Sequence, residues 1–598
     1  MTTNHTTPTT APLLPIPANT ARIGTLAGTA VALAGTFLAW TWTKEFPGDL
    51  TVTGYPGGLQ VLTLISAALT LLMTLSGYGI RGLGWLTPGG TNSPVRLLAL
   101  GTLGTTGYAA GAISYDLGGA VNLEPGAYVS TAGALIAAIA ALGLPGDHPH
   151  TTTGATTWER FRESLRAPTA PHAKALPDWA EILIIIASFG IGLYAFTYGI
   201  DTDYTELFIG FLITTGFAFT ALHRAGVISR LTALTAKHRN ITLAAALVAA
   251  VCFPFTQQKE EYALVGANIL IFGTVALGLN VVVGLAGLLD LGYVAFLGVG
   301  AYAAALVSGS TMSAIGVQFP FWAAVLTGAA ASLVFGVLIG APTLRLRGDY
   351  LAIVTLGFGE IFRLTVNNLN GNSGPDLTNG SQGIPSIPDL DFFGFDFGTR
   401  HDILGFTLGR SANYYLLMLV FTAVVVLVFR RSGESRIGRA WVAIREDETA
   451  ATAMGINAFR LKLIAFALGA TLAGLAGTVQ AHVNYTVTPE QYQFAGSVPP
   501  NSAFLLAAVI LGGMGTLSGP LVGAALLYLI PAKLQFMQDY QLFLFGVALI
   551  LLMRLRPEGL VADRRKQLEF HETDQPDEPE PRQSQETGTG TGIAKAGA

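Results

Sequence analysis

The sequence predicts an all-α, polytopic membrane protein with about 16 transmembrane helices. Of its 598 residues, 51% are hydrophobic and 12% are charged, whereas about a quarter of the residues in a typical soluble protein are charged. One stretch, 268–309, carries a single charge, Asp290, in 42 residues. This stretch is too long and too apolar for a soluble core helix. It predicts two membrane crossings with a short break at 284–290.

The other crossings follow from further apolar runs, which recur as far as residue 555. The segment 241–256 is short for a full crossing. The pair within 502–533 is also compatible with one long helix or with a re-entrant element. The predicted crossings are 22–43, 58–76, 96–115, 126–144, 179–199, 205–223, 241–256, 262–285, 288–309, 320–342, 350–366, 413–429, 463–482, 502–515, 518–533 and 541–555.

The distribution of Lys and Arg predicts how these helices are oriented. With the N-terminus in the cytoplasm, 27 of the 33 basic residues fall on the cytoplasmic side and 6 fall outside, in agreement with the positive-inside rule. A single crossing over 502–533 would move Arg554, Arg556 and the basic residues after them to the outside, so two crossings are favoured. Both chain termini are therefore expected in the cytoplasm.

Polar segments divide the chain into domains. The start of the chain is rich in Thr and Pro, and its end is polar and mostly acidic, so both are expected to be disordered. The resulting domains are a disordered N-terminus (1–21), an additional membrane module of four helices (22–150), a cytoplasmic linker (151–178), a second membrane domain (179–565) and a disordered tail (566–598).

Composition and motifs exclude several classes of function. The single cysteine, Cys252, excludes an internal disulfide and a multi-cysteine metal site. A net charge of −4 gives no indication of nucleic-acid binding. No Gly-x4-Gly-Lys-Ser/Thr phosphate loop occurs, so the chain cannot hydrolyse ATP by that route. We expect no catalytic residue, no cofactor and no metal in this chain, and the bilayer as its surroundings.

The most basic loop, 430–462, predicts a helix at the membrane surface. Residues Ile437 to Met454 can form one short helix, which Gly455 and Asn457 would end. A helix held between two crossings in this way could press against a cytoplasmic partner. The alternative is an ordinary basic loop that obeys the positive-inside rule.

Successive blocks of the sequence also resemble one transporter family. They are GLAGLLDLGYVAFLGVGAYAAAL (284–306), LRLRGDYLAIVTLGFGEIFRLTVNN (344–368), LTNGSQGI (377–384), AIREDETAATAMGINAFRLKLIAFALGATLAGLAGTV (443–479), VILGGMGTLSGPLVGAALL (509–527) and LRPEGL (555–560). In order and spacing they resemble the LivM-type permease subunit of branched-chain amino acid ABC importers. The resemblance covers roughly 180–565 and is strongest from 262.

This resemblance implies a permease domain at 179–565 that works as one subunit of a larger importer in the bacterial cytoplasmic (inner) membrane. Its partners would be a LivH-like permease, two cytoplasmic ABC ATPases that use ATP, and an extracytoplasmic substrate-binding protein. Such permeases carry a coupling helix with the pattern Glu-Ala-Ala, three residues, Gly; here the acid lies one residue early. The expected ATPase-coupling residues are Arg439, Arg445, Glu448, Ala450, Ala451 and Gly455.

Polar side chains inside crossings are costly and are therefore candidates for a translocation path. Glu360 and Arg363 are three residues apart on one predicted helix face and can form a pair; a structural ion pair is the alternative interpretation, and the one we favour. Asp290 is expected at the cytoplasmic turn in a capping role. The candidates for the path are Asn280, Tyr293, Glu360, Arg363 and Asn367.

The function expected from these observations is the permease half of an ATP-driven pathway for branched-chain or related amino acids. A related architecture moves urea or short amides, and this alternative stays open. An ion-coupled secondary transporter would show two similar halves with paired acids at the bilayer midplane, and neither is evident. A membrane-embedded enzyme would need a catalytic constellation in the crossings, but the histidines lie mainly in loops, tails or at crossing ends.

Overall fold

The computed structural model of the chain describes residues 13–42, 57–145, 147, 161, 176–496 and 501–561, apart from gaps at 79, 81–82, 89–91, 258, 346–348, 373, 393, 404–405, 535–539 and 556–557. Each of the 16 predicted crossings contains a helix, which confirms the predicted all-α fold. The predicted disordered tail and most of the predicted linker lie outside the described residues, as do residues 1–12. Helix α1 begins at Ala18, within the predicted N-terminal segment.

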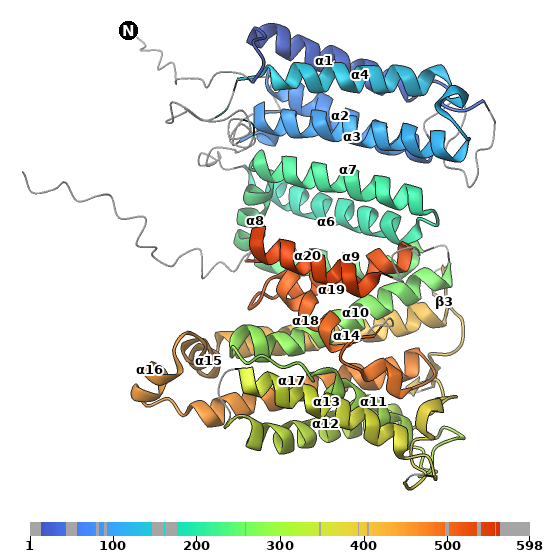
Figure 1. The fold of residues 1–598 in the computed structure, drawn as a ribbon, viewed down its shortest axis with the longest axis vertical. Coiled ribbons are helices and arrows are strands. Elements are labelled where there is room, and N and C mark those ends of the chain that lie inside the picture. Colours follow the sequence, from blue (N-terminus) through green and yellow to red (C-terminus); the bar gives the residue numbers. More distant parts are fainter. Residues whose placement is uncertain are drawn as a thin grey trace, which may run out of the picture.

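The helices are stacked along the long axis of the molecule (Figure 1). The first four lie at one end of the stack, α6 and α7 follow them, and α12 and α13 lie at the other end. The stack therefore begins with the additional N-terminal module. The first two groups are α1 (Ala18–Gly35), α2 (Leu59–Ser76), α3 (Asn92–Asp116) and α4 (Pro125–Leu142), then α6 (Asp178–Asp201), α7 (Thr205–Arg224), α8 (Val227–Lys237) and α9 (Arg239–Cys252).

Small residues bring α1 and α4 together in the N-terminal module. A Cβ atom added to Gly28 would lie 2.5 Å from the Ala137 nitrogen, so only glycine permits this approach. Ser130 Oγ donates a hydrogen bond to the Ala32 carbonyl across the same contact, at 3.1 Å. The buried guanidinium of Arg96 donates to the carbonyls of Ala141 and Pro145 at the end of α4. Thr102 of α3 is within hydrogen-bond distance of Ser66 and Thr70 of α2, so all four helices form one unit.

Helices α6 and α7 connect this module to the rest of the chain. Gly101 of α3 faces Phe217 of α7, whose Cβ would lie 2.7 Å from an added Cβ. On the other side, Asp203 in the α6–α7 turn forms an ion pair with Lys259, 2.6 Å away at the start of α10. Hydrogen bonds from Lys259 and Tyr262 hold the pKa of Asp203 below its usual value. The module is thus docked on the core through described contacts.

Helix α10 lies at the centre of the core and contacts α14, α17, α18 and α19. Thr274 and Thr422 join α10 to α14 by a buried hydrogen bond of 2.8 Å. Gly300 of α11 meets Gly474 of α17 backbone to backbone. The core consists of α10 (Glu260–Asn280) with a π turn (Val281–Leu285), α11 (Val294–Val307), α12 (Phe321–Thr343), α13 (Asp349–Asn368), α14 (Arg410–Glu434), α15 (Arg436–Glu446), α16 (Glu448–Ala453), α17 (Ala458–Val483), α18 (Ser502–Gly512), α19 (Gly519–Lys533) and α20 (Gln541–Leu555).

Not every predicted crossing is a full-length spanning helix. Nine of the described helices are long and apolar enough to cross a membrane, and α1 and α3 are not among them. Helix α18 has 11 residues, or about 16 Å at 1.5 Å per residue, whereas the hydrocarbon core is about 30 Å thick. The predicted crossings 502–515 and 288–309 are therefore wrong as continuous helices.

Glycines with positive φ explain why these helices are short. Gly287 has φ +71°, and α11 begins only at Val294. Gly513 and Gly515 have φ +122° and +79°, and they separate α18 from α19. A residue with a side chain rarely adopts these conformations, so the breaks are encoded in the sequence. One long helix over 502–533 is thereby excluded, because two short helices, α18 and α19, stand there instead.

The loops also contain structure that the sequence did not predict. The predicted cytoplasmic loop at 224–240 holds α8. The predicted helix over Ile437–Met454 is wrong as a single helix, because Asp447 ends α15 and its side chain caps α16. The loop 367–412 contains two small antiparallel hairpins, β1 (Asp391–Phe392) with β2 (Phe395–Asp396) and β3 (His401–Ile403) with β4 (Phe406–Leu408).

Replacing Gly300 by alanine should destabilise the core, because the new methyl group would collide with the α17 backbone at Gly474. We expect the free energy of unfolding to fall by about 1–3 kcal/mol, which is typical of overpacking. Thermal melting of the detergent-solubilised protein measures this change. The control is Gly357→Ala on α13, where an added Cβ meets nothing within 4 Å. Equal melting temperatures for the two variants would contradict the assigned contact.

Candidate functional site

Helices α15 and α16 form an elbow at one end of the core, opposite the end that carries β3 (Figure 1). Two side-chain caps set its turns. Ser435 accepts a hydrogen bond from the Gly438 nitrogen and starts α15. Asp447 accepts from the nitrogens of Thr449 and Ala450 and starts α16. Such residues are the preferred helix caps, so the local sequence explains the shape of the elbow.

The elbow is tied to the core by three polar contacts. Arg445 donates to the Gly284 carbonyl in the π turn after α10, at 2.7 Å. The buried Trp441 donates from Nε1 to the Leu461 carbonyl of α17, at 2.8 Å. Glu448 forms an ion pair with Lys462, also at 2.7 Å. A force applied to α16 would therefore reach both α10 and α17.

The tip of the elbow faces away from the rest of the chain. Met454 is 84% exposed, and an added Cβ at Gly455 would meet nothing within 4 Å. Gly455 has φ +86°, and it follows the end of α16, as predicted. Asn457, which was expected to end the same helix, instead caps α17 by accepting from the Arg460 nitrogen.

The six predicted coupling residues therefore divide into two groups. Arg445 and Glu448 hold the elbow through their ion pairs and hydrogen bonds, and Ala451 is buried within it. Ala450 and Gly455 are exposed at the tip. Arg439 is exposed and donates to the Glu434 carbonyl at 3.1 Å. The structure gathers all six in one elbow, and their role in coupling stays a prediction.

Two breaks in the core helices meet at Asn280, which is fully buried. Its Oδ1 accepts a hydrogen bond from the Gly515 nitrogen, and its Nδ2 donates to the Thr516 carbonyl, both at 2.8 Å. The side chain thus joins the end of α10 to the turn between α18 and α19. Irregular backbone at membrane depth requires partners of this kind.

The first residues of α11 and α18 also meet inside the core. Val294 donates its backbone nitrogen to Ser502 Oγ at 3.1 Å. One residue earlier, Tyr293 donates to the Gly469 carbonyl of α17 at 2.6 Å and is buried. Asp290 is buried as well, and its Oδ1 accepts from the Gly292 nitrogen at 2.9 Å. This local bond agrees with the predicted turn role of Asp290.

The other predicted path residues lie elsewhere, on α13. Arg363 donates from Nε to Glu360 Oε1 at 3.1 Å, which confirms that the two residues pair. Their side chains are 26% and 45% exposed, respectively. Asn367 is half-buried near the end of the same helix. The structure therefore does not bring these three residues together with Asn280 and Tyr293 as one site, and a role in a path stays a prediction.

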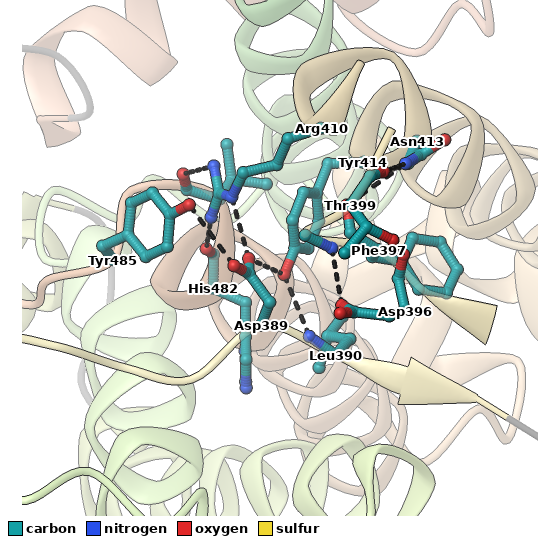
Figure 2. A network of polar contacts seen from close by, with 12 residues as sticks. Asp389, Leu390, Asp396, Phe397, Thr399, Arg410, Asn413, Tyr414, His482 and Tyr485 are labelled. Carbon is teal, nitrogen blue, oxygen red and sulfur yellow. Dashed lines mark hydrogen bonds and ion pairs between the residues drawn. The ribbon is translucent and has the colours of Figure 1, made fainter. Parts of the chain in front are cut away.

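Sequence reasoning missed a cluster of polar contacts around Arg410, which we call the clasp (Figure 2). Arg410 begins α14 and the elbow follows the end of α14, so the clasp lies at the opposite end of the core. Arg410, at the start of α14, donates from Nε to Asp389 of the loop at 2.8 Å. Its guanidinium lies 3.4 Å from the ring centre of Tyr485 and 4.6 Å from that of Tyr414. It also donates to the carbonyls of His482 and Val483 at the end of α17.

This clasp joins the loop 367–412, α14 and α17 through one cation. Tyr414 and Tyr485 donate to Asp389 as well, at 2.8 and 3.3 Å, so the carboxylate has three donors. Asp389 and Tyr485 are 96 residues apart in the chain. No spacing rule connects residues so distant, so the clasp cannot be predicted from the sequence.

Comparisons with known proteins identify the family. The family described as "Branched-chain amino acid transport system / permease component" matches residues 263–553. The LivM permease of Salmonella typhimurium is 38% identical over 344 residues, which are 56% of this chain and 77% of that protein. The chain belongs to the LivM-type permease family. The Escherichia coli LivM has the same identity and coverage. No solved structure gave a significant match.

A second type of permease is also similar to the chain. The Escherichia coli LivH protein is 28% identical over 166 residues, or 26% of this chain and 51% of that protein. The elbow, the breaks around Asn280 and the clasp all fall inside the region that matches the permease family. Helices α1 to α4 precede that region. The permease is therefore a multi-pass membrane protein with eight described α-helices, α1 to α4 and α6 to α9, ahead of the matching part.

Replacing Arg410 by lysine should weaken the clasp, because lysine keeps the charge but loses the forked donors that reach three acceptors. We expect the free energy of unfolding to fall by about 1.5–3 kcal/mol. Thermal melting with Asp389→Asn and the double variant gives the coupling between the two residues. Arg430→Lys, in an exposed pair with Glu434, is the control. Purely additive effects of the two clasp variants would contradict a direct interaction.

Proposed function

We propose that the chain is the permease subunit of an ATP-driven importer for branched-chain or related amino acids. The observation that carries this proposal is membership in the LivM-type family. The relatives are named as branched-chain amino acid transport permeases. The chain itself is not expected to act as an enzyme, and ATP would be used by partner subunits.

The proposed assembly contains a second, LivH-like permease, two cytoplasmic ABC ATPases and an extracytoplasmic binding protein. Similarity to a LivH permease as well as to LivM supports the permease pair. The apolar outer faces of several core helices are exposed in the single chain: Leu338 of α12 is 61% exposed and Ile361 of α13 is 64% exposed. Lipid or a second permease would cover them. The proposed location is the bacterial cytoplasmic membrane, with both termini and the elbow in the cytoplasm.

The contacts of the elbow support a route from the ATPase to the core. Closure of the ATPases would move the tip of α16, and Arg445 would carry this motion to the Gly284 carbonyl. Asn280, four residues before Gly284, holds the turn between α18 and α19. A displacement of the elbow would thus shift the short helices α11, α18 and α19. Broken helices of this kind surround substrate sites in other transporter folds.

Co-purification and transport test the proposal directly. The chain, expressed with its genomic neighbours, should retain a second permease and two ATPases in mild detergent. The complex in proteoliposomes, supplied with its binding protein, should accumulate leucine only with ATP. Competition of leucine uptake by urea and acetamide distinguishes an amino acid importer from the alternative, an importer of urea or short amides. Leucine uptake that follows an ion gradient without ATP would overturn the proposal in favour of a secondary transporter.

The substitution Met454→Asp should abolish ATPase association without harming the fold. Met454 is 84% exposed at the tip of α16, so a carboxylate there would face water in the single chain. In the complex the same carboxylate would be buried against the ATPase without water, which is costly. The ATPase recovered by pull-down should fall at least about tenfold. Met312→Asp, at a 49% exposed methionine beyond the far end of α11, is the matched control. Equal recovery with both variants would refute the assignment of the elbow.

Deleting residues 1–145 should leave uptake largely intact. Helices α1 to α4 lie ahead of the matching family region, and they contact the core chiefly through α7. The deletion exposes the α7 face around Phe217 and Gly210 to lipid, which apolar side chains tolerate. Uptake is measured per amount of complex in the membrane. Complete loss of transport at normal expression would show that the module belongs to the transport machinery.

A further inference from the structure

Three aromatic rings from three elements meet near the end of the core opposite the elbow. Tyr302 comes from α11, Phe362 from α13, and Tyr492 from the short helix η7 (Pro489–Tyr492). Their ring centres lie 6.0, 6.2 and 6.3 Å apart, with tilts of 61° to 74° between the rings. Each ring thus presents an edge to a neighbouring face. We call these three residues the aromatic triad.

The triad fills the space above one glycine of α11. A Cβ added to Gly298 would lie 2.5 Å from Phe362 Cε1 and 2.9 Å from Tyr492 Cγ. The rings therefore close the gap between α11, α13 and η7. Only a residue without a side chain at 298 leaves room for all of them.

Two hydroxyl groups of the triad are buried without a protein partner. Tyr302 is 4% exposed and Tyr492 is 1% exposed, and neither hydroxyl forms a hydrogen bond within the described part of the chain. Other buried tyrosines of the core behave differently: Tyr293, Tyr414 and Tyr415 each donate a hydrogen bond. A buried polar group without a partner is costly. In this conformation the triad therefore lacks two hydrogen bonds that a polar ligand could supply.

The helix that supplies Phe362 is held mainly on one side. Ile353 and Ile361 of α13 are 63% and 64% exposed, so the opposite face of the helix has no neighbour among the residues that the structure describes. On the packed side, Gly359 faces Gly292, whose Cα lies 3.2 Å from a Cβ added at 359. A contact between two glycines has no interlocking side chains. Beside this contact, the Leu291 nitrogen donates to Thr355 Oγ1 at 3.1 Å and anchors the first half of α13. The half that carries Phe362 can therefore tilt away from α11 about this anchor, and this motion would part the triad.

We infer that the aromatic triad is the gate of the transport path at the end opposite the elbow, and that it also contacts the substrate. This inference rests on the proposed function. When the triad parts, the hydroxyls of Tyr302 and Tyr492 gain hydrogen-bonding partners in the carboxylate or ammonium group of an α-amino acid. The ring of Phe362 offers an apolar surface for an aliphatic side chain. Zwitterionic amino acids with apolar side chains match both features.

The first test removes the hydroxyls and keeps the rings. The double variant Tyr302→Phe, Tyr492→Phe in the complete importer should raise the KM for leucine uptake about tenfold. Its melting temperature should be equal to or above that of the unmodified protein, because removing these two hydroxyls breaks no hydrogen bond. Tyr415→Phe is the matched control. It removes a buried hydroxyl that donates to the Ala250 carbonyl at 3.1 Å, so it should lower the melting temperature and leave the KM unchanged.

The second test opens the gate. Phe362→Ala should let leucine leak from loaded proteoliposomes without ATP, whereas the unmodified complex should retain it. An unchanged KM in the double tyrosine variant would overturn the substrate contact. A Phe362→Ala complex that retains leucine as well as the unmodified complex would overturn the gate. Failure of the unmodified complex to import leucine would overturn the proposed function and this inference with it. Import by the unmodified complex together with unaffected variants would overturn the inference alone.

Discussion

The architecture of the core depends on the hydrogen bonds that Asn280 makes to the turn between α18 and α19. Inside a bilayer, backbone that leaves a helix has no water to bind, so protein groups must satisfy it. Asn280 does this for the Gly515 nitrogen and the Thr516 carbonyl. The break after α10 and the break before α19 therefore stabilise each other. Because of this pairing, short helices can begin inside the core, and Val294 of α11 can meet Ser502 of α18.

The two ends of the core are built on different principles. At the elbow, Arg445, Trp441 and the ion pair of Glu448 make specific polar contacts to α10 and α17. At the other end, the clasp around Arg410 fixes α14 and α17, while the half of α13 that carries Phe362 meets α11 and η7 through aromatic rings. Directional polar bonds transmit a displacement, whereas smooth apolar contacts permit one helix to move over another. This difference suits the proposed coupling at the elbow and the proposed gate at the opposite end of the core.

The sequence was sufficient for features that depend on neighbouring residues. Apolar runs predicted the helices, and the spacing of Glu360 and Arg363 predicted their pair. It was insufficient where composition does not report backbone conformation. Residues 286–293 and 513–518 are as apolar and glycine-rich as the helices beside them, so the short lengths of α11 and α18 were missed. The sequence predicts one helix across Asp447, but this residue ends α15 and caps α16. The clasp unites residues that only the folded chain brings together.

The contact between α1 and α4 has a consequence for biogenesis. Ser130 reaches Ala32 across 98 residues of sequence, so α1 enters the membrane long before its partner has been synthesised. Helix α4 is apolar enough to span a bilayer by itself, but α1 is not among the described helices that meet this criterion. Helix α1 can therefore contact α2 first, and its contact with α4 forms later. The module at the start of the chain is then completed only after its fourth helix has left the ribosome.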